Sequence, residues 1–256
     1  MTYWQFHLVF TFPAIAVALA AFLRVTPDTR ERIRQTLFIV ALAVVALVYT
    51  TPWDNYLVKN AVWTYGVDRV SMVIGYVPIE EYAFFVLQPF AAGFLLLALR
   101  NWIAGQRASS ARTGGTPDRD TFQRNWTVRL AGTALLLLAI GATLSVRDES
   151  WTYLRLIVGW SFPPIAIQWI YGGDYIVRRM RLWIPGVVIP TLYFGIADRI
   201  AIGLGIWDIS AATSTGTMVG GLPIEELLFF FVTNVLVVQG LMLLTPYPKN
   251  AFRRSR

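Results

Sequence analysis

Two pairs of adjacent glutamates are the residues of this sequence best suited to acid–base chemistry. Glu80-Glu81 and Glu225-Glu226 each follow a Pro-x dipeptide and open a long apolar segment. Proline suits the first position of a helix and acidic residues suit its first turn, so each motif predicts a helix start. Capping needs fewer acids than this, and ionisable residues in membrane helices usually mark a functional site. We therefore interpret all four glutamates as candidate catalytic residues.

The two members of each pair are expected to point in different directions. Adjacent helical residues lie about 100° apart around the axis. We expect one glutamate of each pair to line a pocket, and its neighbour to meet an arginine, a backbone donor or the other half of the chain. The sequence does not indicate which glutamate does which.

Two aspartates lie upstream of these motifs. Asp54 precedes Trp63, and Asp198 precedes Trp207, at the same spacing. We expect each aspartate just past the end of an apolar span, on the same side as the glutamates. A cap or an ion-pair partner is the alternative interpretation. Asp54 and Asp198 are therefore also candidate catalytic residues.

Aromatic residues accompany the acids. Interfacial anchoring explains any one of them, whereas together they would form a wall of π-faces, each stabilising a cation by about 0.5–2 kcal/mol. The candidate substrate-binding residues are Trp53, Tyr56, Trp63, Trp207, Phe84 and Phe229.

These residue types suit carbocation chemistry. An acid protonates an alkene, aromatic faces hold the cation, and a base removes a different proton. The acid must keep its proton near neutral pH; desolvation raises the pKa of a carboxyl group by up to about 3–5 units, and the helix dipole opposes this. The chain has no cysteine and a single histidine, His7, which we interpret as a local hydrogen-bond partner. We predict no metal and no cofactor.

The chain also repeats itself. Val77–Glu81 resembles Leu222–Glu226, Thr2-Tyr3 matches Thr152-Tyr153, and the aspartates repeat at nearly equal spacing. The repeat predicts two parallel three-helix halves: residues 1–100, then a polar linker and connector helix in 101–150, then residues 151–256. Known parallel-repeat membrane folds place their sites between the halves.

The composition indicates a membrane protein. The chain is 56% hydrophobic and only 14% charged, and its mean hydropathy is +0.54. Apolar stretches of roughly 20 residues can cross a bilayer, so we predict an all-α integral membrane fold with about seven transmembrane helices. The expected spans are Tyr3–Leu23, Gln35–Thr51, Ile79–Leu99, Thr127–Val146, Tyr153–Tyr171, Leu182–Ala197 and Pro223–Leu244. The polar linker covers Arg100–Gln123.

The basic residues predict the orientation. The net charge is +7, and most of the 22 Lys and Arg residues fall on one side of the seven predicted spans. Because cytoplasmic loops carry the excess of Lys and Arg, we expect a multi-pass protein of the cell membrane with its N-terminus outside and its C-terminus in the cytoplasm. The charge then needs no nucleic-acid partner.

The doubled Pro-x-Glu-Glu motif, with Thr51–Tyr56 upstream of its first copy, resembles the small membrane lycopene cyclases. The resemblance runs from about Tyr3 to Leu244 and matches their fused form. It implies cyclisation of the linear ψ-ends of lycopene, taken from the bilayer, to β-rings by protonation and without net redox change. The motif acids of the family map onto the four glutamates and Asp54, and Asp198 is our extension through the repeat.

The resemblance also implies that no partner subunit is obligatory, because both halves are fused. The flavin fingerprint of the soluble-type cyclases is missing from the sequence. Its second half has Ala197-Asp198-Arg199 in place of the Pro-Trp-Asp-Asn-Tyr string, so we expect the halves to be inequivalent.

Other functions remain open. A related enzyme that forms ε-rings or acts on C50 carotenoids would use the same residues. A transporter built on parallel repeats would also place polar residues at repeated helix starts. A retinal protein needs a lysine within a span, and Lys59 and Lys249 both lie outside the predicted spans.

Overall fold

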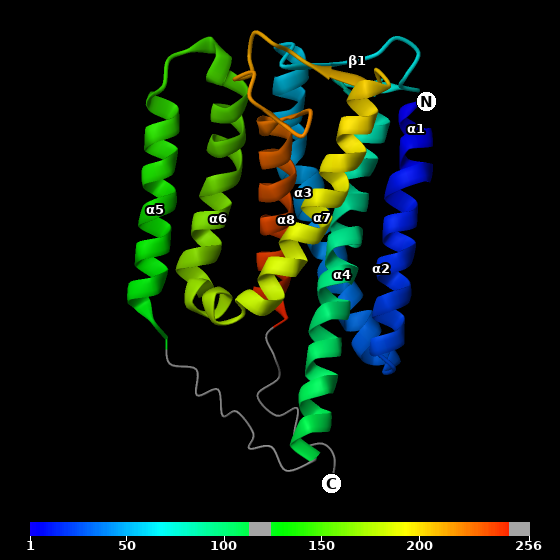
Figure 1. Ribbon diagram of the computed structural model, residues 1–256, viewed down its shortest axis with the longest axis vertical. Helices are drawn as coiled ribbons and strands as arrows, with labels where there is room; N and C mark the ends of the chain where they lie inside the picture. Colours follow the sequence, from blue (N-terminus) through cyan, green and yellow to red (C-terminus); the bar gives the residue numbers. More distant parts are fainter. Residues whose placement is uncertain (113–123, 246–256) are drawn as a thin grey trace.

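The structure, a computed structural model, describes residues 1–112 and 124–245 as a bundle of long helices (Figure 1). The first helix is continuous and consists of α1 (Tyr3–Phe6), the π-turn η1 (His7–Thr11) and α2 (Phe12–Val25). The others are α3 (Thr29–Lys59), α4 (Ile79–Arg112), α5 (Trp126–Ser145), α6 (Thr152–Arg178, preceded by the short η2, Glu149–Trp151), α7 (Met180–Gly203) and α8 (Ile224–Leu244).

Six helices in the described part of the chain are long and apolar enough to cross a membrane. They are Tyr3–Val25, Thr29–Lys59, Ile79–Gln106, Trp126–Ser145, Met180–Gly203 and Ile224–Leu244. The predicted all-α membrane class is therefore confirmed, and the chain is a multi-pass membrane protein. The remaining expected span, Tyr153–Tyr171, lies in α6, which has 27 residues and packs beside α5 and α8. Polar residues make α6 less apolar, so a seventh crossing stays a prediction.

Several helices are longer than the apolar pattern suggests. Asp54 and Asp198 were expected just past the ends of two spans, and this expectation is wrong: they lie inside α3 and α7. Packing of buried residues such as Leu57 extends α3 beyond Pro52, because tertiary contacts rather than propensity supply most helical stability. The predicted linker Arg100–Gln123 is helical as far as Arg112; its remainder, 113–123, lies outside the described residues.

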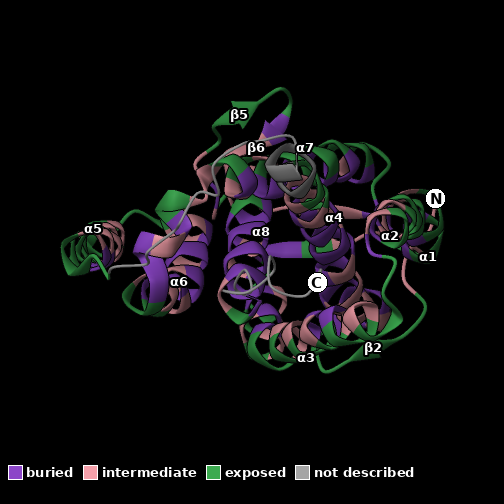
Figure 2. Ribbon diagram, turned by 90° about the horizontal axis from the view of Figure 1, so that it is seen from below, coloured by how far each residue is buried: buried purple, intermediate pink, exposed green. Residues whose placement is uncertain are grey.

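The helices are arranged with internal pseudo-symmetry. Figure 2 shows α4 and α8 near the centre of the bundle. The helices α2 and α3 pack on α4 as α6 and α7 pack on α8, and α4 contacts α7 as α8 contacts α3. This matches the predicted pair of parallel three-helix repeats. The connector α5 packs against α6.

Short strands join the two repeats at the end where α4 and α8 begin (Figure 1). The strand β1 (Trp63–Tyr65) pairs antiparallel with β4 (Trp207–Ile209), so that Thr64 lies opposite Asp208. Two hairpins, β2 (Val73–Ile74) with β3 (Val77–Pro78) and β5 (Met218–Val219) with β6 (Leu222–Pro223), lead into α4 and α8. The prediction contained no strands, although aromatic and β-branched residues here favour them.

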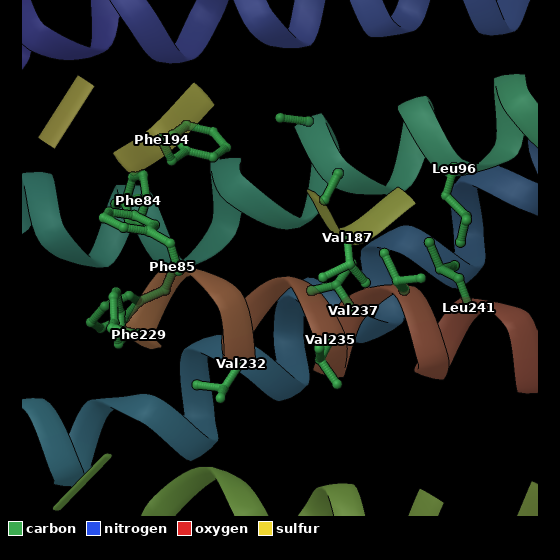
Figure 3. Packing of buried hydrophobic residues seen from close by; sticks show 14 of the residues in the cluster. Phe84, Phe85, Leu96, Val187, Phe194, Phe229, Val232, Val235, Val237 and Leu241 are labelled. Atoms are coloured by element: carbon green, nitrogen blue, oxygen red, sulfur yellow. The ribbon is translucent and has the colours of Figure 1, made fainter. Parts of the chain in front are cut away.

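The interior is closely packed between α4, α7 and α8. Phe84, Phe194 and Phe229 lie at one end of this core, and Leu96 and Leu241 lie towards the other (Figure 3). Lipid is as apolar as these side chains, so close van der Waals contact, rather than removal from water, holds the helices together.

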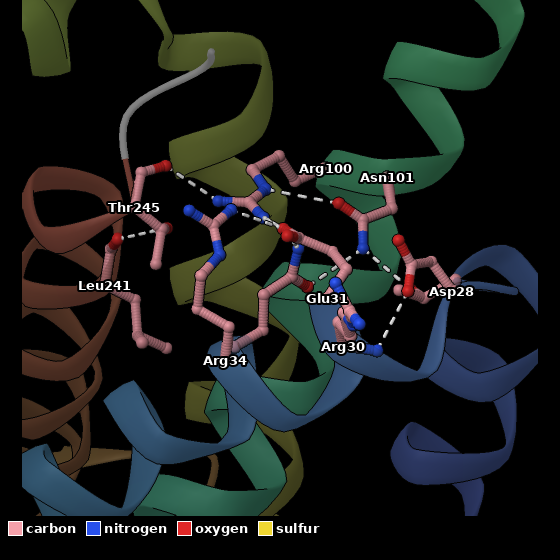
Figure 4. Close-up of polar contacts among 10 residues, drawn as sticks. Asp28, Arg30, Glu31, Arg34, Arg100, Asn101, Leu241 and Thr245 are labelled. Carbon is pink, nitrogen blue, oxygen red and sulfur yellow. Dashed lines mark hydrogen bonds and ion pairs between the residues drawn. The ribbon is translucent and has the colours of Figure 1, made fainter. Parts of the chain in front are cut away.

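Polar contacts secure the opposite end of the bundle (Figure 4). Arg100 Nη1 donates to the carbonyl of Thr245 at 2.7 Å, which ties α4 to the end of α8. Asn101 Nδ2 donates to Thr26 Oγ1 at 2.7 Å and to Gln35 Oε1 at 3.0 Å. These bonds fix α4 to α3 and to the turn before it, and so hold the helix that carries Glu80 and Glu81.

Candidate active site

The two glutamates of each pair have different surroundings. Glu81 and Glu226 line a small cavity of about 30 Å³ between the repeats. The N–H of Ser71 donates to Glu80 Oε1 at 2.8 Å, and the N–H of Thr215 donates to Glu225 Oε1 at 2.7 Å. Each pair thus has one member at a cavity and one that accepts a backbone hydrogen bond.

Tyrosines hold the two glutamates that face the cavity. Tyr3 Oη donates to Glu81 Oε2 at 2.6 Å, and Tyr153 Oη donates to Glu226 Oε1 at 2.7 Å. Tyr65 on β1 also donates to Glu81 Oε2, at 3.3 Å. Desolvation, reinforced by Glu81, raises the pKa of the Tyr65 phenol well above its usual value, so this group stays a proton donor.

We did not predict these tyrosines as site residues. The repeat nevertheless contains the signal, since Thr2-Tyr3 matches Thr152-Tyr153. A polar side chain repeated at the start of a membrane helix marks a position with a specific partner.

The two aspartates are both buried. Asp198 also lines the acid-lined cavity, and in the described part of the chain it is the one that is hydrogen-bonded. Trp207 Nε1 donates to Asp198 Oδ1 at 2.7 Å. The equivalent bond between Trp63 and Asp54 is missing: within residues 1–112 and 124–245, neither oxygen of Asp54 nor the indole nitrogen of Trp63 has a hydrogen-bond partner. Both aspartates lie near enough to Glu81 to interact with it electrostatically.

The cluster therefore concentrates carboxyl groups in a region that water hardly reaches. Glu81, Glu226 and Asp54 are only 7%, 3% and 0% exposed. The ion pairs of the described residues involve other acids, Glu31 and Asp174. Burying an ionised carboxylate without a cation is costly, and the neutral acid is far easier to bury. The arrangement thus favours carboxylic acids that can donate a proton.

A larger apolar cavity of about 200 Å³ adjoins the acid-lined one, between α3, α4, α6 and α8. Phe84 and Phe229 line both cavities. They occupy repeat-related positions three residues after Glu81 and Glu226, so one phenyl ring from each repeat lies between the acids and the apolar space.

Most of the predicted aromatic residues gather here. Trp63 and Trp207 line the acid-lined cavity with the two phenylalanines. Trp53 stacks on Trp160, with ring centroids 4.5 Å apart, and on Phe229 at 5.9 Å. Tyr56 is not brought to the site: it is 53% exposed and lines neither cavity.

Tyr49 and Trp160 line the apolar cavity and were missed by sequence reasoning. Aromatic residues are common in membrane helices, so nothing in the sequence distinguishes these two. Their position depends on how α3 and α6 pack against α8.

His7 has a local role, as we expected. It is fully buried in the π-turn, with Nδ1 3.1 Å from Thr11 Oγ1 and Nε2 2.9 Å from the carbonyl oxygen of Glu80. Single π-turns within α-helices often occur near functional sites. Here the turn joins the first helix to the start of α4.

The acids, the aromatic rings and the tyrosines other than Tyr3 fall within two segments that match one protein family. The family model described as lycopene cyclase matches residues 4–99 and 150–242, which are the two repeats without the segment between them. The chain belongs to the lycopene cyclase family.

Relatives in the lycopene cyclase family cover most of this chain. It is 40% identical over 202 residues to a lycopene beta-cyclase of Halobacterium salinarum, which is 79% of each chain. It is 34% identical over 241 residues to bifunctional lycopene cyclase/phytoene synthases of Phycomyces blakesleeanus and Blakeslea trispora, which is 93% of this chain and 38% of theirs. No solved structure matches the chain.

Proposed function

We propose that this chain cyclises the linear ψ-ends of lycopene to β-rings, giving γ-carotene and β-carotene. One observation carries the proposal: buried carboxyl groups adjoin an apolar cavity across two phenyl rings, in a chain of the lycopene cyclase family. Neither ε-ring formation, nor action on C50 carotenoids, nor transport is favoured by that family membership.

The reaction needs one proton donor and one proton acceptor. Protonation at C2 of the ψ-end leaves a tertiary cation at C1. The C5=C6 double bond then attacks C1, which forms the C1–C6 bond and moves the cation to C5. Loss of the C6 proton restores the C5=C6 bond in a β-ring, so protons balance and no redox partner is needed.

The geometry suggests how the residues share this work. Glu81 and Glu226 exchange the protons, since they line the cavity, and Tyr3 and Tyr153 orient them through hydrogen bonds. A positioned acid or base contributes about 10²–10⁴-fold to a rate. Glu80 and Glu225 instead hold the loops that precede α4 and α8.

Aromatic rings then stabilise the cation. Phe84 and Phe229 lie between the acids and the apolar cavity, with Trp53, Trp63 and Trp207 around them. Faces of such rings attract a desolvated cation by about 2 kcal/mol. They also exclude water, which would otherwise capture it as an alcohol.

We place the acid-lined end on the outer side of the cell membrane, with the N-terminus outside and the C-terminus in the cytoplasm. The excess of Lys and Arg on the opposite side supports this orientation. The two repeats, residues 1–100 and 151–256, act as one unit without a further subunit, because the site draws on both.

Expression in cells that accumulate lycopene tests the proposal. The expected result is conversion to γ-carotene and β-carotene, identified by chromatography and absorbance. A variant with both Glu81→Gln and Glu226→Gln serves as the inactive control, with its amount in the membrane measured. Unchanged lycopene in the presence of membrane-inserted, unaltered protein would contradict the proposal, and ε-rings would contradict the assigned ring type.

A further inference from the structure

The apolar cavity lies on one side of the pseudo-symmetric bundle, and a matched pair of hydrogen bonds defines its counterpart. Tyr49 Oη donates to the carbonyl of Trp160 at 2.8 Å, which links α3 to α6. Tyr193 Oη donates to the carbonyl of Phe10 at 2.8 Å, which links α7 to the first helix. The two tyrosines, like Asp54 and Asp198, are therefore equivalent positions of the two repeats.

The next residue differs between the two sides. Thr50 lines the apolar cavity on α3. Its counterpart on α7 is Phe194, which is 1% exposed. The Phe194 ring lies close to Phe84 (Figure 3), edge-on, with centroids 5.6 Å apart. It also stacks on Phe230, with centroids 6.0 Å apart. A phenyl ring thus fills, beside α7, the place where a threonine leaves space beside α3.

The size and lining of the cavity fit a branched hydrocarbon. An apolar cavity of about 150 Å³ already binds benzene, and this one has about 200 Å³. Its lining is mostly apolar and aromatic, and it includes Val45 and Tyr49 of α3, which are 59% and 43% exposed. The cavity therefore reaches the outer surface of the bundle, where lipid surrounds a membrane protein.

The aspartates on these two sides of the bundle also differ in their hydrogen bonding. Asp54 lies one helical turn after Thr50, and its oxygens have no partner in the described part of the chain. Asp198 lies one turn after Phe194 and accepts a bond from Trp207. The side with the open space thus also has the aspartate that is not held.

We propose that the end group of the polyene enters from the lipid between α3 and α6 and reaches the acids through this cavity alone. The difference between Thr50 and Phe194 then decides which side of the bundle admits it. The proposal rests on the proposed function. One site then serves both ends of a substrate, which must leave and rebind, reversed, to gain its second ring.

The first test fills the cavity. Thr50→Phe places in α3 the side chain that α7 carries. We expect it to lower the rate of lycopene conversion by about tenfold or more, because the added ring occupies space that the end group needs. Val48→Phe is the matched control, because it adds the same ring to the same helix at a residue that is 68% exposed. We expect this control to stay within about twofold of the unaltered chain. Full activity of membrane-inserted Thr50→Phe would overturn the proposal.

The second test does not depend on turnover or on the folding of Thr50→Phe. The chain has no cysteine, so Val45→Cys and its counterpart Ile189→Cys each introduce a single thiol. Val45 lines the cavity, and Ile189 is exposed on α7. In detergent, we expect lycopene to slow maleimide labelling several-fold at position 45 and not at position 189.

The outcomes separate this inference from the proposed function. Equal protection at the two positions, protection at position 189 alone, or none at either would overturn the inference, even if the unaltered chain converts lycopene. Failure of the unaltered chain to convert lycopene would instead contradict the proposed function.

Discussion

The two repeats of this lycopene cyclase family member place their glutamates by the same contacts. Tyr3 donates to Glu81 in the first repeat, as Tyr153 donates to Glu226 in the second. A loop N–H donates to Glu80 in one half and to Glu225 in the other, at nearly equal distances. The pseudo-symmetry therefore extends to individual hydrogen bonds.

The contacts of α3 and α7, by contrast, differ between the two repeats. Trp207 donates to Asp198, whereas Trp63 and Asp54 do not bond to each other. Phe194 packs into the core where Thr50 lines a cavity. Duplicating a membrane unit reproduces its acids, and a few changes of side-chain size then give the two halves different surroundings.

The largest expected effect tests the symmetric part. Glu81→Gln and Glu226→Gln each keep the size of the side chain and remove its acid, and we expect each to lower the rate of conversion by about 10²–10⁴-fold. The rate is measured on lycopene in proteoliposomes, normalised to inserted protein. If either variant kept most of its activity, the proton chemistry would belong to the other half alone.

The next effect tests the asymmetric part. Asp54→Asn is expected to lower the rate by about tenfold or more, because its unpartnered carboxyl lies on the side of the open cavity. Asp198→Asn is expected to cost less, since an amide oxygen still accepts from Trp207. The same conversion assay compares the two. A larger loss in Asp198→Asn would assign the working side to the second repeat.

A third comparison concerns stability. Glu80→Ala and Glu225→Ala each remove the acceptor of a loop N–H, and leaving a buried donor unsatisfied costs about 1–3 kcal/mol. We expect both variants to unfold in detergent several degrees below the unaltered chain and by similar amounts, with the Gln variants between. Unequal losses would show that the two loops are held differently.

The smallest effect concerns Tyr56, a predicted substrate-binding residue that lines neither cavity. Tyr56 is 53% exposed, so Tyr56→Ala is expected to keep the rate within about twofold. Trp53→Ala on the same helix is the contrast, since Trp53 stacks on Trp160 and Phe229, and its loss should lower the rate clearly. A strong loss in Tyr56→Ala would extend the substrate path to the outer surface of α3.

Parts of the fold followed from local rules, and other parts did not. The length of the apolar stretches predicted the membrane helices. The ends of α3 and α7 depend on packing beyond those stretches, so the prediction put Asp54 and Asp198 outside helices that in fact contain them. The pairing of β1 with β4 is between segments far apart in the chain. Such pairing leaves little trace in a single sequence.

The sequence by itself determined that lipid surrounds most of this chain, that the chain contains two repeats, and where its acids lie along the chain. Apolar composition, repeated spacing and helix-start chemistry are local properties. Tertiary structure alone decided that Glu81 and Glu226 face the cavity, because adjacent helical side chains diverge and packing selects the inward one. It alone set Thr50 beside open space and Phe194 within the core, because a cavity depends on how side chains of several helices fill one volume.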